Sequence, residues 1–135
     1  MELFVADSES SSIRSIEIKG KKGCRAVVGG DESSSNLKAF GDEDGVGTEA
    51  RLQHPLGVHF VQGKNVVMVA DTYNHKIKVI DPFNNEIFSW LGSGSPGLKD
   101  GYTSEACFSE PSGLTSIFDH ERGDVSAYIA DCVNN

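Results

Sequence analysis

The chain has 135 residues, of which 38% are hydrophobic, and a formal net charge of −8. That length corresponds to about one ordinary domain, and 15 glycines and 4 prolines between short apolar runs indicate many turns and short strands. The acidic balance argues against nucleic-acid binding, which needs clustered Lys and Arg to displace counterions from phosphates. No stretch approaches the roughly 20 apolar residues of a membrane span, and we expect a cytoplasmic protein.

Nine runs predict strands, and the predicted class is therefore all-β. Residues 66–70 form a continuous apolar run, as in a strand buried on both faces. Residues 76–79 alternate with a period of two, which predicts one face exposed to water. Short links rich in Gly, Asn, Asp and Pro predict antiparallel pairing of successive strands. In chain order the runs are 3–6, 13–18, 26–29, 56–61, 66–70, 76–79, 86–91, 113–118 and 125–130.

An internal repeat organises these strands. An Ala-Asp pair closes an apolar run at Asp7, again at Asp71 and again at Asp131, at sequence offsets of 64 (71 minus 7) and 60 (131 minus 71). A second block, residues 50–58, returns at 106–114, an offset of 56 (106 minus 50). Because the offsets differ while the motifs persist, the loops vary in length and the strands do not.

A four-stranded antiparallel meander repeated at this period is typical of a β-propeller blade. The blade parts are about 1–30, 55–91 and 111–135, so one complete blade is flanked by two incomplete ones. Closing a ring takes at least about four blades. The chain is therefore expected to be a fragment of a longer protein, the missing blades being its partners, or else to complete a ring with other copies. Unpaired edges predict poor solubility or oligomerisation of the chain alone.

Residues 70–77, Ala-Asp-Thr-Tyr-Asn-His-Lys-Ile, resemble the NHL repeat, which is named after an Asn-His-Leu triplet and departs here only in the third letter. Residues 40–47 and 52–57 strengthen the resemblance, which covers the chain from Leu3 onward. It implies a fragment of a six-bladed propeller that, in one member, follows a thioredoxin-like domain. No Cys-x-x-Cys pair occurs here, so redox activity does not carry over. In the first repeat Ser10-Ser11-Ser12 replaces Asn-His-Lys.

The repeat signature is interpreted as structural. Asp7, Asp71 and Asp131 are expected to pin their turns by accepting hydrogen bonds from the N–H groups two and three residues on. Asn74 and His75 are expected to be turn residues, with Asn tolerating the backbone geometry.

Two glycines of the repeat are also interpreted as structural. Gly57 and Gly113 follow Pro55 and Pro111 by two residues at the start of the innermost strands. Without a side chain at these positions, strands can crowd toward the propeller axis.

No functional role is expected for two further groups of side chains. The three cysteines have no metal-ligand spacing and are expected to be buried or idle thiols; they are Cys24, Cys107 and Cys132. The longest basic cluster is expected to be a solvated turn; it consists of Lys19, Lys21, Lys22 and Arg25.

Metal chemistry is the alternative function. The stretch from Asp42 to Gly47 resembles an EF-hand loop, but Phe40 and Arg51 stand at the first and last ligand positions, so weak divalent-ion binding is only the residual hypothesis. A metal-dependent propeller hydrolase or lyase would need acids on the innermost strands. Residues 56–61 and 113–118 contain none, and His59 is the sole candidate ligand. No catalytic residue and no cofactor are expected.

The preferred function is a non-catalytic protein-interaction scaffold. In an antiparallel meander, the Ala-Asp turns and the inter-blade loops lie at one end, where acids outnumber bases. Such a face would attract a basic segment of a protein partner; the alternative is that the acids only keep the loops solvated. RNA binding by an NHL propeller is a third interpretation, disfavoured by the charge. The candidate face consists of Asp42, Glu43, Asp44, Glu49, Asp100 and Glu105.

Overall fold

Short β-strands are the main elements of the computed structural model, which describes residues 1–20, 23–31, 36 and 38–135. Lys21 and Lys22 of the predicted basic turn lie outside these residues. Three one-turn 3-10 helices, η1 (Gly47–Glu49), η2 (Thr72–Asn74) and η3 (Thr103–Glu105), interrupt the described strands. The strands are β1 (Glu2–Asp7), β2 (Ser12–Glu17), β3 (Cys24–Gly29), β4 (Gly45–Val46), β5 (Gly57–Val61), β6 (Val66–Asp71), β7 (Lys76–Asp81), β8 (Glu86–Leu91), β9 (Pro111–Asp119) and β10 (Asp124–Asp131).

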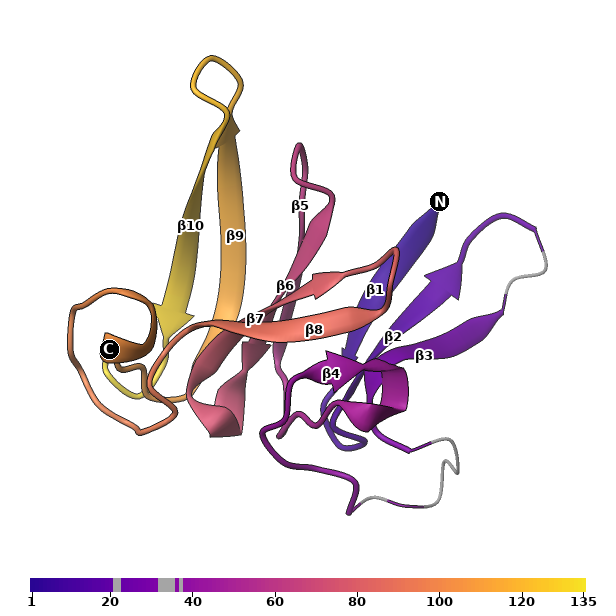
Figure 1. Ribbon diagram of the computed structural model, residues 1–135, viewed down its shortest axis with the longest axis horizontal. Helices are drawn as coiled ribbons and strands as arrows, with labels where there is room; N and C mark the ends of the chain where they lie inside the picture. Colours follow the sequence, from indigo (N-terminus) through magenta and orange to yellow (C-terminus); the bar gives the residue numbers. More distant parts are fainter. Residues whose placement is uncertain (21–22, 32–35, 37) are drawn as a thin grey trace.

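The strands form three antiparallel sheets, each one a propeller blade or part of one. Blade one has the order β1-β2-β3, blade two β4-β8-β7-β6-β5, and blade three β10-β9. Figure 1 shows the sheets side by side, blade three on the left and blade one on the right. The prediction of an all-β partial propeller is confirmed.

The strand positions follow from the apolar runs between turn residues. Every predicted run coincides with a strand, although Ile18 and Leu56 at the ends of two runs lie just outside β2 and β5, and β8 has the predicted bounds. In β6 the residues from Val67 to Ala70 are all buried, as a continuous apolar run predicts. None of the described helices is long and apolar enough to cross a membrane.

The prediction of an exposed face on residues 76–79 is wrong. Ile77, Lys78, Val79 and Ile80 are all buried, and the Lys78 residue is 0% exposed. Both faces of β7 are covered by neighbouring blades, since Ile80 packs in the cluster shared with blade one and Val79 in the cluster shared with blade three. The alternation of Lys and Ile therefore does not mark a boundary with water here.

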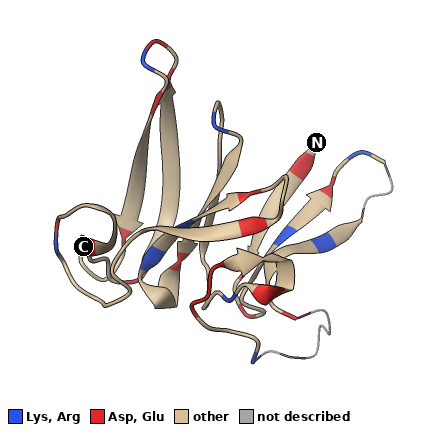
Figure 2. Ribbon diagram, viewed as in Figure 1, with Lys and Arg blue, Asp and Glu red and all other residues tan. Residues whose placement is uncertain are grey.

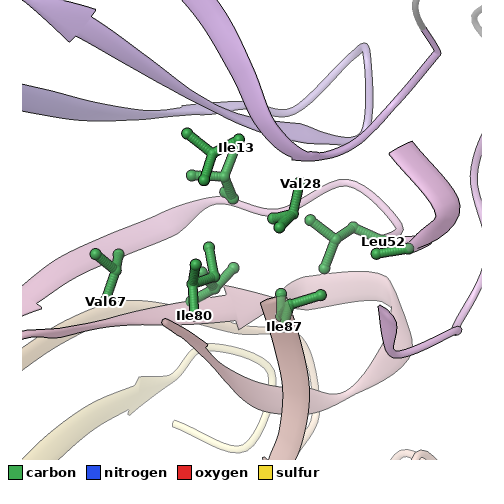
Figure 3. Packing of buried hydrophobic residues seen from close by; sticks show 9 residues of the cluster. Ile13, Val28, Leu52, Val67, Ile80 and Ile87 are labelled. Carbon is green, nitrogen blue, oxygen red and sulfur yellow. The ribbon is translucent and has the colours of Figure 1, made fainter. Parts of the chain in front are cut away.

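Apolar side chains fill the spaces between neighbouring blades. Figure 3 shows the larger cluster, in which Ile13 and Val28 of blade one meet Val67, Ile80 and Ile87 of blade two. Leu52 comes from the inter-blade loop and closes this core at one end. A smaller cluster between blades two and three contains Val61, Met68, Val79, Leu114, Val125 and Ala127.

The predicted crowding at the inner strands is present at Gly57. A Cβ atom placed there would lie 1.9 Å from the Ser112 carbonyl oxygen of blade three. Gly113, at the equivalent position of blade three, meets nothing nearer than the Ala130 Cβ at 3.6 Å among the described residues. The close approach predicted for both glycines is therefore seen only where two blades meet.

Strand β4 was not predicted. It belongs to the loop between blades one and two, and it pairs Gly45 with Ile87 and Val46 with Glu86 on the outer strand β8. The loop thus runs along the outer edge of blade two before it enters β5. Two of its aspartates, Asp42 and Asp44, are placed beside β7 and β8 as a result.

Candidate interaction face

The candidate site lies at one end of the blades, called here the loop-bearing end. It consists of the turns after β1, β6 and β10 and the inter-blade loops 30–56 and 92–110. In Figure 1 this end points downward, and the short hairpin turns of β5–β6 and β9–β10 point upward. Figure 2 shows acidic residues gathered along the loop that leads into β4.

The turn after β6 is tied to the inter-blade loop before it by a clamp of two side chains. Asp71 accepts a hydrogen bond from the Gln53 N–H (2.8 Å) on one carboxylate oxygen and from the Asn74 amide (2.8 Å) on the other. The Asn74 amide also donates to the Gly41 carbonyl (2.7 Å). One aspartate and one asparagine therefore fix both ends of the loop segment 41–53.

The clamp recurs in blade three with the same geometry. Asp131 accepts from the Ser109 N–H (2.6 Å) and from the Asn134 amide (2.6 Å), and Asn134 donates to the Gly97 carbonyl (2.7 Å). In blade one, Ser10 replaces the asparagine and donates to the Asp7 carbonyl (3.3 Å). The repeat signature thus joins blades to their preceding loops.

The structure corrects two details of the predicted turns. The donors to Asp71 and Asp131 are loop residues 18 and 22 positions earlier (71 minus 53 and 131 minus 109), not the N–H groups two and three residues on. The residue with left-handed backbone is His75, with φ of 54°. Asn74 acts instead through its side chain.

A buried lysine gathers three of the carboxylates at this end, and the sequence did not point to it. The Lys78 ammonium lies 2.8 Å from Asp42, 3.1 Å from Asp44 and 3.6 Å from Asp71. It also donates to the Arg51 carbonyl (3.5 Å). Two of these acids belong to the loop and one to β6, so Lys78 links the loop electrostatically to the centre of blade two.

The charges of this cluster shift one another's pKa. Burial works to raise the pKa of Asp42 and Asp44, but hydrogen bonds and charge from Lys76, Lys78 and Ser89 outweigh it and lower both pKa values. Burial works to lower the pKa of Lys78, and the surrounding carboxylates outweigh it and raise that pKa. Both loop acids and the lysine are therefore held in their charged forms.

Asp71 behaves differently. Burial raises its pKa to about 6, against the hydrogen bonds from Gln53 and Asn74 and the charge of Lys78, and the Asp42 charge adds to the increase. The folded state thus keeps the Asp71 proton to a higher pH than the unfolded chain does. Between about pH 4 and pH 6 the unfolded state binds fewer protons, so stability falls as pH rises.

We therefore expect the free energy of unfolding to depend on pH between about pH 4 and pH 6, and Asp71→Asn to remove this dependence. Relative to this variant, the free energy of unfolding of the original chain should decrease from pH 4 to pH 6.5 and be constant above that. Asp42 and Asp44 have lowered pKa values, so their protonation changes the free energy of unfolding only below about pH 4. Urea unfolding of both proteins at several pH values measures the difference. A parallel pH dependence of the two chains would contradict the assignment to Asp71.

The six predicted acids of the face fall into two groups. Asp42 and Asp44 are engaged within the chain, by Lys76 (2.5 Å) and Lys78 and by the Ser89 N–H (2.7 Å). Within the part of the chain that the structure describes, the side chains of the other four make no hydrogen bond or ion pair. These four exposed acids are Glu43, Glu49, Asp100 and Glu105.

Large apolar side chains are exposed beside these acids, which sequence reasoning missed. Tyr102 is 84% and Leu98 78% exposed, and both lie in the loop before blade three. Phe40 is 51% exposed in the other loop. Tyr73 is 47% exposed and stacks on His54, with 4.6 Å between ring centroids. The sequence did contain a sign of these exposed side chains, since Phe40 and Tyr102 lie next to glycines in the two acidic inter-blade loops.

Of the residues considered for metal chemistry, the stretch from Asp42 to Gly47 lies at the loop-bearing end and His59 does not. His59 faces blade three and its Nε2 contacts the Ser116 hydroxyl (2.8 Å). No group of three or more His, Cys, Asp or Glu suited to a metal ion occurs among residues 1–20, 23–31, 36 and 38–135. The cysteines are free thiols, and Cys24 and Cys132 are exposed rather than buried.

Comparison with known proteins agrees with the repeat. No protein-family model matches the chain. Bovine (Bos taurus) NHL repeat-containing protein 2 is 46% identical over 134 residues, which are 98% of this chain and 18% of that protein. The human (Homo sapiens) NHL repeat-containing protein 2 is 44% identical, with 98% of this chain and 18% of that protein covered. The Arabidopsis thaliana chloroplastic protein SUPPRESSOR OF QUENCHING 1 is 47% identical over 99% of this chain and 12% of that protein.

Solved structures show the same fold. An auxiliary nutrient binding protein from Bacteroides ovatus superposes with a TM-score of 0.76 at 25% identity, covering 98% of this chain and 33% of that one. Another, from Bacteroides thetaiotaomicron, gives 0.73 at 21% identity, covering 96% and 32%. The chain spans less than a fifth of the NHL relatives, but it matches them over nearly its whole length. The chain belongs to the NHL-repeat family of β-propeller proteins.

Proposed function

We propose that the chain is a non-catalytic scaffold that binds a protein segment at its loop-bearing end. The observation that carries the proposal is the loop before blade three, where Leu98 and Tyr102 are exposed beside Asp100 and Glu105, two acids whose side chains pair with none of the described residues. A mixture of an aromatic anchor and acidic neighbours suits a protein segment better than a small polar ligand.

The two kinds of side chain would have different tasks. Tyr102 and Leu98 would supply the apolar contact area, since a few well-packed aromatic side chains dominate the affinity of most interfaces. The exposed acids would attract a basic segment and orient it before contact, an effect that weakens with salt. Asp42 and Asp44 would not take part directly, because the lysines of β7 already neutralise them.

Charge reversal at the face tests the proposal. We expect Asp100→Lys with Glu105→Lys to remove the partners captured by the full chain in affinity purification, and Tyr102→Ala to weaken them by about thirtyfold, as for a hot-spot residue. Neither change touches Asp42 or Asp44, so the Lys78 cluster is preserved.

The matched control reverses two exposed acids at the opposite end. Glu121→Lys with Asp124→Lys changes the net charge by the same amount in the β9–β10 hairpin. This variant should capture the same proteins as the original chain. Equal capture by the face variant and the hairpin variant would disprove the proposed face.

A further inference from the structure

Tyr73 lies in the turn after β6, at the loop-bearing end, where its ring is fixed from one side. The ring stacks on the His54 imidazole, with 4.6 Å between the centroids and 18° between the planes. Its backbone is held as well, since the Tyr73 N–H donates to the Gln53 carbonyl (3.1 Å). The residue is nevertheless 47% exposed. It is therefore a fixed aromatic surface that remains open to solvent beside the stacked imidazole.

The repeat indicates which residue borders Tyr73 on its other side. His54 lies between the turns of blades one and two, because it stacks on Tyr73 while its Nδ1 lies 3.8 Å from the Glu9 carboxylate. Tyr73 is the repeat equivalent of Glu9 (73 minus 9, an offset of 64). Glu110 is the equivalent of His54 (110 minus 54, an offset of 56). Since His54 borders Glu9, Glu110 should border Tyr73 in the same way.

The backbone contacts agree with this placement of Glu110. His54 and Glu110 both have left-handed backbone, with φ of 50° and 56°. The His54 N–H donates to the Ser11 hydroxyl of the blade-one turn (3.3 Å). The Glu110 N–H donates to the His75 Nδ1 of the blade-two turn (3.2 Å). Glu110 is therefore joined to the turn of Tyr73 as His54 is joined to the turn of blade one.

The Glu110 carboxylate is free to accept hydrogen bonds from a ligand. Glu110 is exposed, and its side chain makes no hydrogen bond or ion pair with any described residue. Both segments that border Tyr73, residues 53–55 and 109–111, are described, and together they leave the ring exposed. An aromatic surface and a carboxylate thus lie next to each other at the loop-bearing end.

This combination suits the side chain of an arginine. A guanidinium stacks on an aromatic ring and donates two parallel hydrogen bonds to one carboxylate, whereas an ammonium has neither the plane nor the fork. The surrounding charges also favour a cation. Glu9, whose side chain is 85% exposed, is a second acid beside the stack. Lys76, the base nearest to Tyr73 in the sequence, is already paired with Asp42.

We propose that Tyr73 and Glu110 form a docking site for an arginine side chain of a partner segment. The guanidinium lies on the Tyr73 ring and donates to the Glu110 carboxylate, and Glu9 adds attraction at longer range. The inference rests on the proposed function, because it names the side chain by which the basic segment is recognised. It makes the interaction selective for arginine over lysine, which general attraction to an acidic face does not.

Nuclear magnetic resonance of the full chain, with ¹⁵N in the backbone and ¹³C in the tyrosine rings, tests this site. The probes are three peptides, acetyl-Gly-X-Ser-Gly-amide, in which X is arginine, lysine or citrulline. We expect the arginine peptide at millimolar concentration to shift the Tyr73 ring and Glu110 N–H signals. The lysine peptide should bind about tenfold more weakly, and the citrulline peptide, which keeps the planar shape without the charge, should bind more weakly by at least as much.

Variants of the full chain locate the binding. Glu110→Gln should weaken the arginine peptide about tenfold, the value of a charge-assisted hydrogen bond. Tyr73→Val, which introduces the residue found at the equivalent position 133, should abolish binding, and Tyr73→Phe should preserve it because the ring makes the contact. Glu121→Gln alters an exposed acid of the β9–β10 turn and should change nothing. Equal binding of the arginine and citrulline peptides, or unweakened binding by Glu110→Gln, would overturn the proposal.

Affinity purification separates this inference from the proposed function. The arginine site predicts that Tyr73→Val loses the partners that the original chain captures. If Tyr73→Val keeps them while Asp100→Lys with Glu105→Lys loses them, the arginine site is wrong and the scaffold function stands. If the arginine peptide binds as expected but the chain captures no protein, the scaffold function is wrong and the arginine site stands.

Discussion

Replacing Lys78 with methionine should lower the free energy of unfolding by about 3–5 kcal/mol, the cost of removing one partner from a buried ion pair. The Lys78 side chain is 0% exposed, and three carboxylates lie within 3.6 Å of its ammonium. Without the ammonium, Asp42, Asp44 and Asp71 repel one another, and Asp71 is itself fully buried. Urea unfolding followed by the fluorescence of Trp90 measures the loss.

Lys76→Met is the matched control. Lys76 lies on the same strand, but its side chain is 18% exposed and pairs with Asp42 alone. We expect this change to cost at most about 1 kcal/mol, as for a pair near the surface. Adding Asp42→Asn and Asp44→Asn to Lys78→Met should recover part of the lost stability. Equal effects of Lys78→Met and Lys76→Met would contradict the role given to the buried lysine.

Lys78→Met should also loosen the inter-blade loop that carries Asp42 and Asp44 before the whole blade unfolds. Asp42 and Asp44 are the loop's ionic links to β7, and Asp44 also accepts from the Ser89 N–H. Strand β4 contributes only two residues to the sheet. The amides of β4 should therefore exchange with solvent faster in Lys78→Met, while those of β6 stay protected up to global unfolding.

All strands except β4 could be predicted because each of them is a local feature of the sequence. An apolar run such as 66–70 carries its own evidence for a buried strand, and the recurrence of the Ala-Asp pair sets the order of the strands within a blade. The incomplete blades were predicted on the same basis. None of these inferences depends on contacts with side chains that are distant in the sequence.

Lys78 could not be found this way because its burial depends on a distant segment of the chain, the inter-blade loop that carries Asp42 and Asp44. An alternating Lys-Ile-Lys-Val run has the pattern of an exposed strand face, and only the fold of the loop reveals that the second lysine is enclosed. The same limit explains the wrong donors to Asp71. A recurring turn motif suggested local hydrogen bonds, and the actual donor is the Gln53 N–H of the inter-blade loop.

The acidic face was predicted from topology and charge alone, and topology cannot separate acids that pair with internal lysines from acids that make no such contact. The structure makes that separation, with Asp42 and Asp44 on one side and Asp100 and Glu105 on the other. Charge reversal of Asp42 and Asp44 would damage the blade itself. The informative substitutions are those in the loop before blade three.

Gly57→Ala should destabilise the chain by about 1–3 kcal/mol or more, as overpacking of a filled core does. The added Cβ would lie 1.9 Å from the Ser112 carbonyl oxygen, and neither atom can turn away, because the Cβ is bonded directly to one inner strand and the oxygen belongs to the backbone of the other. Relief requires blade three to move away from blade two, which would also open the apolar contacts around Met68 and Leu114. Thermal unfolding by circular dichroism measures the effect.

Gly113→Ala is the matched substitution, at the same position of the next repeat, where the offset is again 56 (113 minus 57). Here the new Cβ meets only the Ala130 Cβ at 3.6 Å, an ordinary contact. Alanine also restricts the unfolded chain, which stabilises a protein by about 0.4–1 kcal/mol where the backbone permits it. The two substitutions are therefore expected to have opposite signs. A similar loss of stability in both would mean that the glycines serve the backbone conformation of the strand, and that contact between blades does not explain them.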